Sequence, residues 1–312
     1  MQTESVIFLT PQEQEGLPKP LELMQLEVLE KRGGLTTDNK KQLWIQRMGY
    51  QGEQIFYDFI TKYKKPHWKV FYRTWLNING RVECDFIVAT KVSLYFFEIK
   101  NYSGSFIYEN HQQFINNRRF KGDIFNQFKQ MRERTSDMCE ELNYSGGITH
   151  KLVYINPYYT ANFPQEWQNF LLHFNRLNDF FDQMQRQETI LPLSNLSAEN
   201  FDAMIQQQFL CPAPYQVTSI PSEQLSKLQS GIECKHCGSF SLEMTRYNVK
   251  CNHCHQSEVK REAIQRLFND YWAIYPNASL NTASLFKLND GFFPESYLYK
   301  QLKNETTYNL YI

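Results

Sequence analysis

Two runs of strand-forming residues lie close together in the first third of the chain. Val82–Val88 and Val92–Ile99 are rich in Val, Ile, Phe and Tyr, and only residues 89–91 separate them. Two such runs with a short connection predict a β-hairpin. The second run is apolar at adjacent positions such as Phe96 and Phe97, and this predicts a sheet that is buried on both faces.

The register of this hairpin decides where its polar residues lie. With a turn centred near Lys91, Asp85 falls opposite Glu98 or diagonal to it, and strand alternation places Lys100 on the same face. A slip of one residue would put the two acids on opposite faces. Neighbouring carboxylates repel each other, and a divalent cation with oxygen ligands neutralises them. The pattern therefore indicates the site of a metal-dependent phosphodiesterase, which needs two acids and a lysine. The alternative is a solvated strand face, because short motifs of this kind often occur by chance.

Helical periodicity predicts two helices before the hairpin. The first covers Leu21–Lys31 and ends at Gly33-Gly34, and we expect it to be an extension packed on the α/β domain. The second runs from Gly52 to about Lys64. Its inward stripe is apolar except for one acid, and the stripe consists of Glu53, Phe56, Tyr57 and Ile60.

Three more elements are predicted after the hairpin. Asp123 is the expected N-cap of a helix that ends near Asn143. Lys151–Ile155 reads as a buried strand, and His173–Arg186 reads as a helix.

Four strings of residues in this region resemble the nuclease-related domain (NERD) family, a branch of the PD-(D/E)xK nuclease superfamily. They are Gly49-Tyr50-Gln51-Gly52-Glu53-Gln54, Glu83-Cys84-Asp85, Glu98-Ile99-Lys100-Asn101-Tyr102-Ser103-Gly104 and Asn126-Gln127. The resemblance covers about residues 20–185, and its most specific part is the string that begins at Glu98. Glu83-Cys84-Asp85 stands where a Gln-Ile-Asp-like triplet is expected, and Phe125-Asn126 replaces an Asn-Pro-like approach to Gln127. Neither departure changes the expected metal ligands.

The resemblance implies an α/β fold with a restriction-endonuclease-like mixed central sheet flanked by helices. In a mechanism for such a site, Asp85 and Glu98 would hold Mg²⁺ or Mn²⁺ together with the backbone carbonyl of Ile99. Lys100 would position or deprotonate the attacking water and shield the phosphate.

Two further residues enter the site through the resemblance alone. It implies that Glu53 reaches the site from its helix, where it holds a second cation or a water on the first one. It also implies that Gln127 hydrogen-bonds a water or the scissile phosphate. The alternative for Glu53 is an acid near a helix N-terminus, which the helix dipole favours.

Four of the seven cysteines form two CxxC pairs at the spacing of a zinc ribbon. They are Cys234, Cys237, Cys251 and Cys254. Four thiolates close a tetrahedral site, so we expect a structural zinc on which this small ribbon depends to fold. Residues 239–249 would form its hairpin. Redox-active CxxC pairs are the alternative. His236, His253 and His255 lie within the cluster and could replace a thiolate. We expect them to be spectators or to lie just outside the ligand set, because four cysteines already suffice.

The remaining segments suggest five regions along the chain. They are an N-terminal helical extension (1–45), the nuclease domain (46–187), a proline-rich connector (188–230), the ribbon (231–260) and a helical C-terminal unit (261–312). The last unit has predicted helices at Glu262–Tyr275, Thr282–Leu288 and Glu295–Lys303. Its dense aromatic residues are expected to form a core, with a base-stacking platform or a helix-turn-helix-like DNA contact as alternatives. Lys300 and Lys303 could touch phosphate.

The composition limits the classes of binding partner and the cellular compartment that we expect. The 33 basic and 33 acidic residues balance, so a nucleic acid would have to bind in a local groove. No stretch approaches the ~18 apolar residues of a membrane span, and the N-terminus lacks a leader pattern, so we expect a cytoplasmic protein without a membrane partner. DNA is the favoured substrate. RNA-directed cleavage and a non-cleaving scaffold are the alternatives, and double-strand cutting would favour a homodimer.

Overall fold

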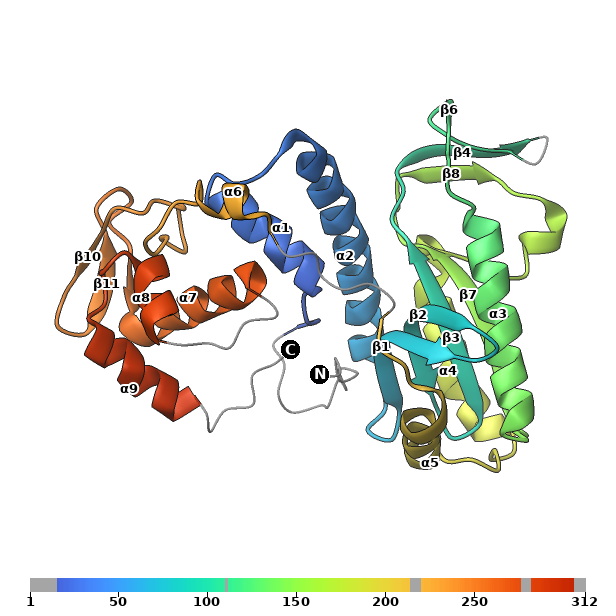
Figure 1. Ribbon diagram of the computed structural model, residues 1–312. Helices are drawn as coiled ribbons and strands as arrows, with labels where there is room; N and C mark the ends of the chain where they lie inside the picture. Colours follow the sequence, from blue (N-terminus) through green and yellow to red (C-terminus); the bar gives the residue numbers. More distant parts are fainter. Residues whose placement is uncertain (1–15, 110–111, 214–219, 276–281, 306–312) are drawn as a thin grey trace. The chain divides into compact units, whose positions relative to one another are not determined.

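The computed structural model describes residues 16–109, 112–213, 220–275 and 282–305, and these form two compact units (Figure 1). The first unit contains residues 16–18 and 48–213. The second contains residues 19–47, 220–275 and 282–305. One helix, α2 (Thr37–Tyr63), begins in the second unit and ends in the first.

A five-stranded mixed sheet forms the centre of the first unit. Its strands follow the order β1-β2-β3-β7-β9. They are β1 (Lys69–Asn77), β2 (Arg81–Ala89), β3 (Ser93–Lys100), β7 (Gly147–Tyr154) and β9 (Leu171–His173). Strand β2 is antiparallel to both β1 and β3, β7 pairs in parallel with β3, and β9 pairs in parallel with β7. The mixed sheet with flanking helices confirms the predicted fold class.

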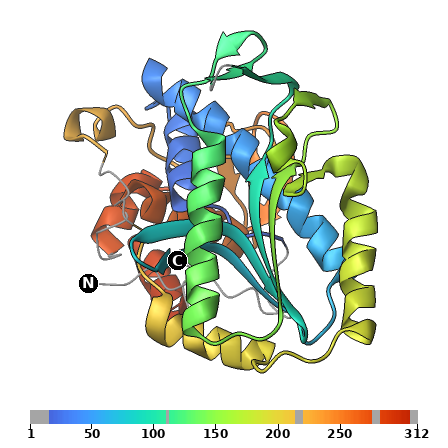
Figure 2. The same cartoon turned by 90° about the vertical axis from the view of Figure 1, so that its right-hand side faces the viewer.

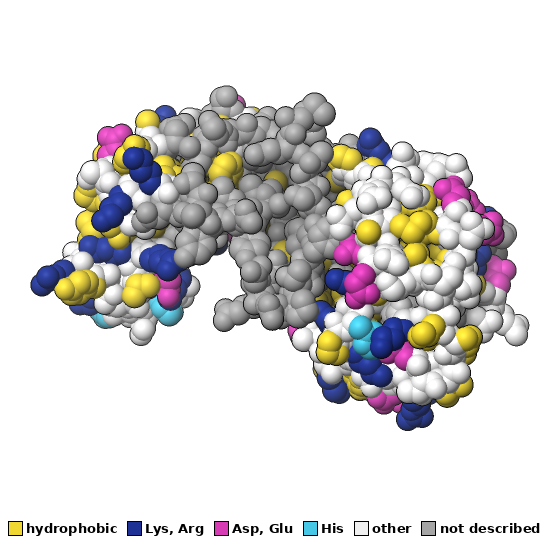
Figure 3. Space-filling view, turned by 90° about the horizontal axis from the view of Figure 1, so that it is seen from below, with side chains coloured by type: hydrophobic (Ala, Val, Ile, Leu, Met, Phe, Trp, Pro, Cys, Tyr) yellow, Lys and Arg dark blue, Asp and Glu magenta, His cyan; other side chains and the backbone are white. Residues whose placement is uncertain are grey.

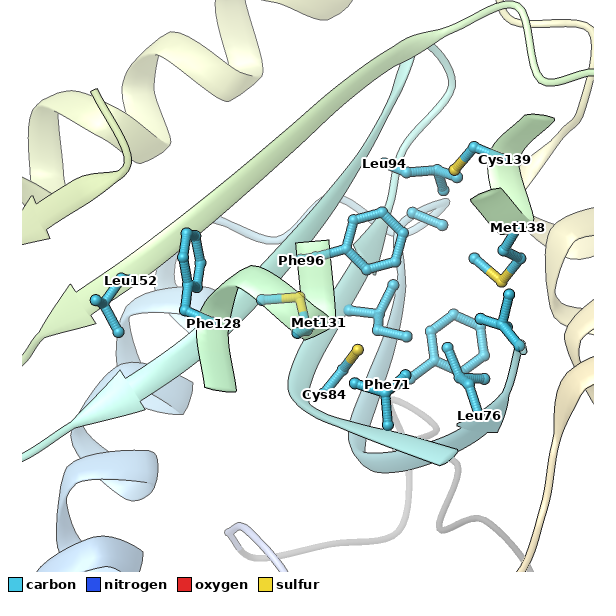
Figure 4. Close-up of a cluster of buried hydrophobic side chains, with 14 of the residues drawn as sticks. Phe71, Leu76, Cys84, Leu94, Phe96, Phe128, Met131, Met138, Cys139 and Leu152 are labelled. Carbon is cyan, nitrogen blue, oxygen red and sulfur yellow. The ribbon is translucent and has the colours of Figure 1, made fainter. Parts of the chain in front are cut away.

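Helices cover both faces of this sheet. On one face α3 (Ile124–Glu141) crosses the strands (Figure 2) and packs Phe128 and Met131 against them (Figure 4). On the other face α2 and α4 (Leu177–Ile190) pack Phe56 and Phe181. Every residue of β3 from Ser93 to Ile99 is buried, which confirms the expectation of a strand enclosed on both sides.

Several shorter elements complete the first unit. A four-stranded sheet has the order β6-β5-β4-β8. Its strands are β4 (Gly104–Glu109), β5 (Gln112–Ile115), β6 (Arg118–Arg119) and β8 (Tyr159–Asn162). Two 3-10 turns lie at Gln165–Trp167 and Phe174–Arg176, and helix α5 (Ala198–Met204) continues into a π-helical turn at Ile205–Phe209. Phe201 of α5 lies 5.9 Å from Phe71 of β1, ring centroid to ring centroid, so this part of the expected connector contributes to the α3-side core.

The second unit gathers the N-terminal helix with the C-terminal elements. Helix α1 (Leu21–Lys31) packs on α7 (Lys260–Ile274), with Val28 and Leu29 in the same apolar cluster as Phe268. This corrects the expected packing of the helix on the α/β domain. The physical reason is that an amphipathic helix requires an apolar surface, and its sequence does not state which one.

A three-stranded sheet and three further helices complete this unit. They are β10 (Leu242–Met244), β11 (Asn248–Cys251), β12 (Ser257–Val259), α6 (Ser222–Leu225), α8 (Thr282–Asn289) and α9 (Glu295–Glu305). The expected hairpin is formed by β10 and β11, and β12 adds a third strand. Phe268, Tyr271 and Phe293 are buried, as expected for a core, whereas the Tyr299 side chain is 51% exposed. Lys303 lies 4.9 Å from the Tyr299 ring.

Two helix starts differ from the predictions. Helix α2 begins at Thr37 rather than at Gly52, because Gly49 and Gly52 lie inside the helix and do not interrupt it. At Gly52 a Cβ would lie 2.7 Å from the Cβ of Asn101, so this glycine permits a close approach of the helix to the end of β3. Helix α4 begins at Leu177, and His173 instead ends β9.

The surface carries both signs of charge, as the balanced composition predicts, and the described helices are too polar or too short for a membrane span. Acidic and basic side chains are interspersed on the face of the protein seen in Figure 3. None of the helices in the described part of the chain has the length and apolar character to cross a membrane.

Candidate active site

The β2–β3 hairpin has the register that the sequence predicted. Ala89 pairs with Leu94 and Phe86 pairs with Phe97, while the N–H of Thr90 donates to the carbonyl of Ser93 over 3.0 Å to close the turn. If this register is continued by one residue, Asp85 lies opposite Glu98.

The backbone pairing of β2 with β3 ends before Asp85, and its pairing with β1 skips this residue. The ladder with β3 ends at Phe86–Phe97, and the ladder with β1 passes from Tyr72–Phe86 to Thr74–Cys84 without a pair at Asp85. In the opening, the N–H of Ile99 donates to Oδ2 of Asp85 over 2.6 Å. The carboxylate therefore takes the place of a strand carbonyl, which fixes its position between the two strands.

Glu98, Lys100 and Gln127 form a connected polar group beside this opening. Nζ of Lys100 donates to Oε1 of Glu98 over 2.6 Å and to Oε1 of Gln127 over 3.1 Å. Gln127 lies in the first turn of α3, where Asp123 caps the helix by accepting from the N–H of Asn126, as predicted. Burial alone would lower the pKa of Lys100, but the charges of Glu98 and Asp85 outweigh it and raise that pKa. Lys100 is therefore an ammonium ion at neutral pH in this arrangement.

Glu53 reaches the same region from α2. The hydroxyl of Tyr72 on β1 donates to Oε2 of Glu53. Burial raises the pKa of Glu53, the Tyr72 hydrogen bond and the charge of Arg73 oppose that rise, and the charge of Glu98 adds to it. Because α2 begins at Thr37, Glu53 lies in the helix interior, and the alternative explanation of an acid at a helix N-terminus is wrong.

The electrostatics of this group favour a cation. Burial raises the pKa of Asp85 well above its ordinary value, and the charges of Glu98 and Glu53 raise it further. The acids at the opening offer carboxylate oxygens, and these hard ligands suit Mg²⁺ or Mn²⁺. The carboxylates are not drawn into one tight cluster, since no set of three acids among the described residues has oxygens that all lie within 4.8 Å. In the structure the ammonium group of Lys100 forms an ion pair with Glu98 and neutralises its charge.

Three polar residues near the strand opening were not predicted as site residues from the sequence. Tyr72 holds Glu53, and Nε of Arg73 donates to Oε1 of Glu83 over 3.2 Å. Glu83 carried a detectable signal, because it shares the strand face of Asp85 by alternation. Tyr72 and Arg73 carried none, because the pairing of β1 with β2 depends on tertiary structure.

The four ribbon cysteines form a second candidate site. Their Sγ atoms all lie within 4.8 Å of one another, with 3.6 Å between Cys234 and Cys254 and 3.6 Å between Cys237 and Cys251. The N–H groups of Cys254 and His253 point at Sγ of Cys251 and lower the pKa of that thiol to about 6. A closed set of four sulfur ligands fits Zn²⁺. The side chains of His236, His253 and His255 are exposed and outside this set.

A separate surface cleft of about 260 Å³ lies along α2. Gln51, Gln54 and Asp58 are among its lining residues, and Asp58 is the one acid among them. The cleft lacks the combination of acids and lysine found at the strand opening, so we assign it no chemistry.

Comparison with known proteins agrees with the first of these sites. Residues 48–159 match the sequence model of the nuclease-related domain (NERD) family. The match includes Glu53, the β2–β3 hairpin and Gln127, and it ends before the ribbon. It confirms the resemblance for this part of the chain. No curated protein and no solved structure matches the chain significantly.

Proposed function

We propose that this chain, which carries a nuclease-related domain over residues 48–159, is a metal-dependent nuclease that hydrolyses phosphodiester bonds of DNA. The observation that supports the proposal most directly is the interrupted pairing of β2 at Asp85, beside which Glu98 and Lys100 make an ion pair of 2.6 Å. An ordinary core does not contain a strand opening lined with acids and a lysine, because burying charged groups costs free energy.

Asp85 and Glu98 would hold the Mg²⁺ or Mn²⁺ ion, with the carbonyl of Ile99 as a further oxygen ligand. That carbonyl is suited to the role because the N–H of Ile99 already points at Asp85, and both backbone groups of one strand residue point to the same neighbour. When bound, the cation would lower the pKa of an attacking water and stabilise the charge that develops on the phosphate.

Lys100 would act as a hydrogen-bond donor to a phosphate oxygen rather than as a base. The raised pKa of its ammonium supports this choice, because such a group gives up its proton poorly at neutral pH. Oε1 of Gln127 accepts a hydrogen bond from Nζ of Lys100. This bond would hold the ammonium group in place when the carboxylate of Glu98 binds a cation instead. The amide nitrogen of Gln127 would remain available to donate to the phosphate. Tyr72 would orient Glu53 to hold a water or a second cation.

The four-cysteine ribbon would hold one structural zinc. Its role in this proposal is to stabilise the second unit. Cutting of both strands would favour a homodimer with two sites, and light scattering of the purified protein measures that state.

The test is a cleavage assay on supercoiled plasmid, linear duplex, single-stranded DNA and RNA, with Mg²⁺, Mn²⁺ or EDTA. We expect DNA cleavage with either metal and none with EDTA. Asp85→Asn and Lys100→Met should each lower the rate by roughly 10²-fold or more, whereas Asp58→Asn, in the separate cleft, should not.

Other outcomes decide between the alternatives. Wild-type rates in the Asp85 and Lys100 variants would refute the assigned site. Preferential RNA cleavage would support the RNA-directed alternative, and metal-independent binding without cleavage of any substrate would support the scaffold.

A further inference from the structure

Arg73 has a backbone conformation that its residue type rarely adopts. Its φ is +46°, in the left-handed region, although it lies in the middle of β1. The other described residues with positive φ, apart from glycine, are Asn, Asp or His, and all of them lie outside helices and strands. Those residue types tolerate the left-handed region, whereas for other residues it costs about 1–2 kcal/mol.

The distortion changes which face of the sheet β1 presents. Phe71 and Leu76 are five positions apart and would lie on opposite faces of a regular strand. Both belong to the core on the α3 side, whereas Tyr72 packs on the α2 side. The strand therefore switches faces at Arg73. As a result two consecutive residues both reach acids of the candidate site, since Tyr72 donates to Glu53 and Arg73 donates to Glu83.

An ion pair with Glu83 holds the Arg73 side chain, and Nε of Arg73 lies 3.2 Å from Oε1 of Glu83. The two side chains are 22% and 24% exposed. Residues held in sparsely populated backbone conformations concentrate at functional sites.

The charge around the strand opening also requires a donor for the phosphate. Four acids, Glu53, Glu83, Asp85 and Glu98, lie close enough together that the charge of Glu98 raises the pKa values of the other three. An incoming phosphodiester adds another negative charge, and a planar guanidinium binds phosphate oxygens through paired N–H groups.

We propose that Arg73 is a further catalytic residue whose guanidinium leaves Glu83 to bind a non-bridging oxygen of the scissile phosphodiester. The inference rests on the proposed nuclease function. In this assignment the left-handed backbone serves to direct the guanidinium to the acid-lined opening, and Glu83 holds it there until the substrate arrives.

Arg73→Gly tests the assignment, because glycine adopts a φ of +46° without strain. The variant should keep or exceed the denaturation temperature of the wild type. Its kcat/KM on DNA should fall by roughly 10²-fold, the size of effect seen when one preorganised donor is removed. Millimolar guanidinium chloride should restore part of the lost rate, and sodium chloride at the same concentration should not.

Asn79→Gly is the matched control. Asn79 also has a left-handed backbone, with φ of +51°, but it lies in the β1–β2 turn. This control should cleave at the wild-type rate and should not respond to guanidinium. Wild-type cleavage by Arg73→Gly would overturn the assignment, as would a loss that guanidinium does not rescue, because the side chain would then be structural. A wild-type chain that cleaves nothing would refute the nuclease proposal itself.

Discussion

Oδ2 of Asp85 accepts a 2.6 Å hydrogen bond from the backbone N–H of Ile99 at the point where the β2–β3 ladder has ended. A side chain thus completes the contact between two strands, and it joins the strand of Asp85 to the strand of Glu98. Any residue at position 85 that lacks an acceptor would leave the Ile99 N–H unpaired.

Asp85→Asn should stabilise the fold in buffer without Mg²⁺ or Mn²⁺. The raised pKa of Asp85 means that the folded chain binds this proton more tightly than the unfolded chain. The free energy of unfolding of the wild type therefore falls as pH rises from the ordinary aspartate pKa toward the raised value. Asparagine does not ionise and still accepts from the N–H of Ile99, so the variant should have a higher free energy of unfolding than the wild type at pH 7.

Urea denaturation at pH 4 and pH 7 after dialysis measures this gain, and no chelator is needed that would also remove zinc. Asp85→Ala is the control, since it removes the charge but also the acceptor, and it should gain less. Added Mn²⁺ should stabilise the wild type and not Asp85→Asn. A variant less stable than the wild type at pH 7 would contradict the burial argument.

Gly52→Ala and Gly49→Ala should change stability in opposite directions. A Cβ at Gly52 would lie 2.7 Å from Asn101 Cβ and 3.0 Å from Ile155 Cγ2, so the helix must shift at a cost of about 1–3 kcal/mol. Nothing lies within 4 Å of a Cβ at Gly49, and alanine there should stabilise the helix by about 0.5–1 kcal/mol. Urea denaturation distinguishes them. Equal effects would mean that α2 does not approach β3 as closely as described.

Arg32 and Asp270 should behave as a buried ion pair. Nη2 of Arg32 lies 2.7 Å from Oδ2 of Asp270, and the two side chains are 1% and 9% exposed. Arg32→Met or Asp270→Asn should each cost about 3–5 kcal/mol, because each leaves a buried charge or its partners unsatisfied.

The double variant provides the control for this pair. Arg32→Met combined with Asp270→Asn should cost less than the sum of the two single changes. It should not fully recover, because Arg32 also donates to the carbonyls of Gln229 and Gly231. Thermal unfolding of the four chains gives the coupling free energy. Single losses under about 1 kcal/mol, typical of an exposed pair, would contradict the prediction.

The ribbon should bind about one zinc per chain. Cys251→Ser removes a ligand carried by β11, and zinc content measured by mass spectrometry should fall with it. Hydrogen exchange should quicken across residues 242–259, because the three strands there depend on the metal. Cys211→Ser, outside the cluster, should retain zinc. Unchanged zinc after loss of all four ribbon thiols would exclude this site.

Local features of this protein could be predicted because their causes are local. The hairpin register follows from two apolar runs with three residues between them, and Asp123 caps α3 through a residue three positions away. The two CxxC pairs likewise bring their thiols together at ribbon spacing. In each case the interacting groups are near in sequence or joined by one turn, so spacing alone determines their geometry.

Tertiary structure decided the features that depend on distant surfaces. The amphipathic pattern of α1 required an apolar partner, but only the folded chain selects α7, more than two hundred positions away. Helix α2 continues through Gly52 and so places Glu53 inside the helix, and the close approach of Asn101 leaves no space for a Cβ at position 52. The face switch of β1 likewise follows from the left-handed backbone of Arg73, which the alternation of its sequence does not indicate. Periodicity records which side of an element is apolar, whereas the partner of that side depends on the packing free energy of the whole chain.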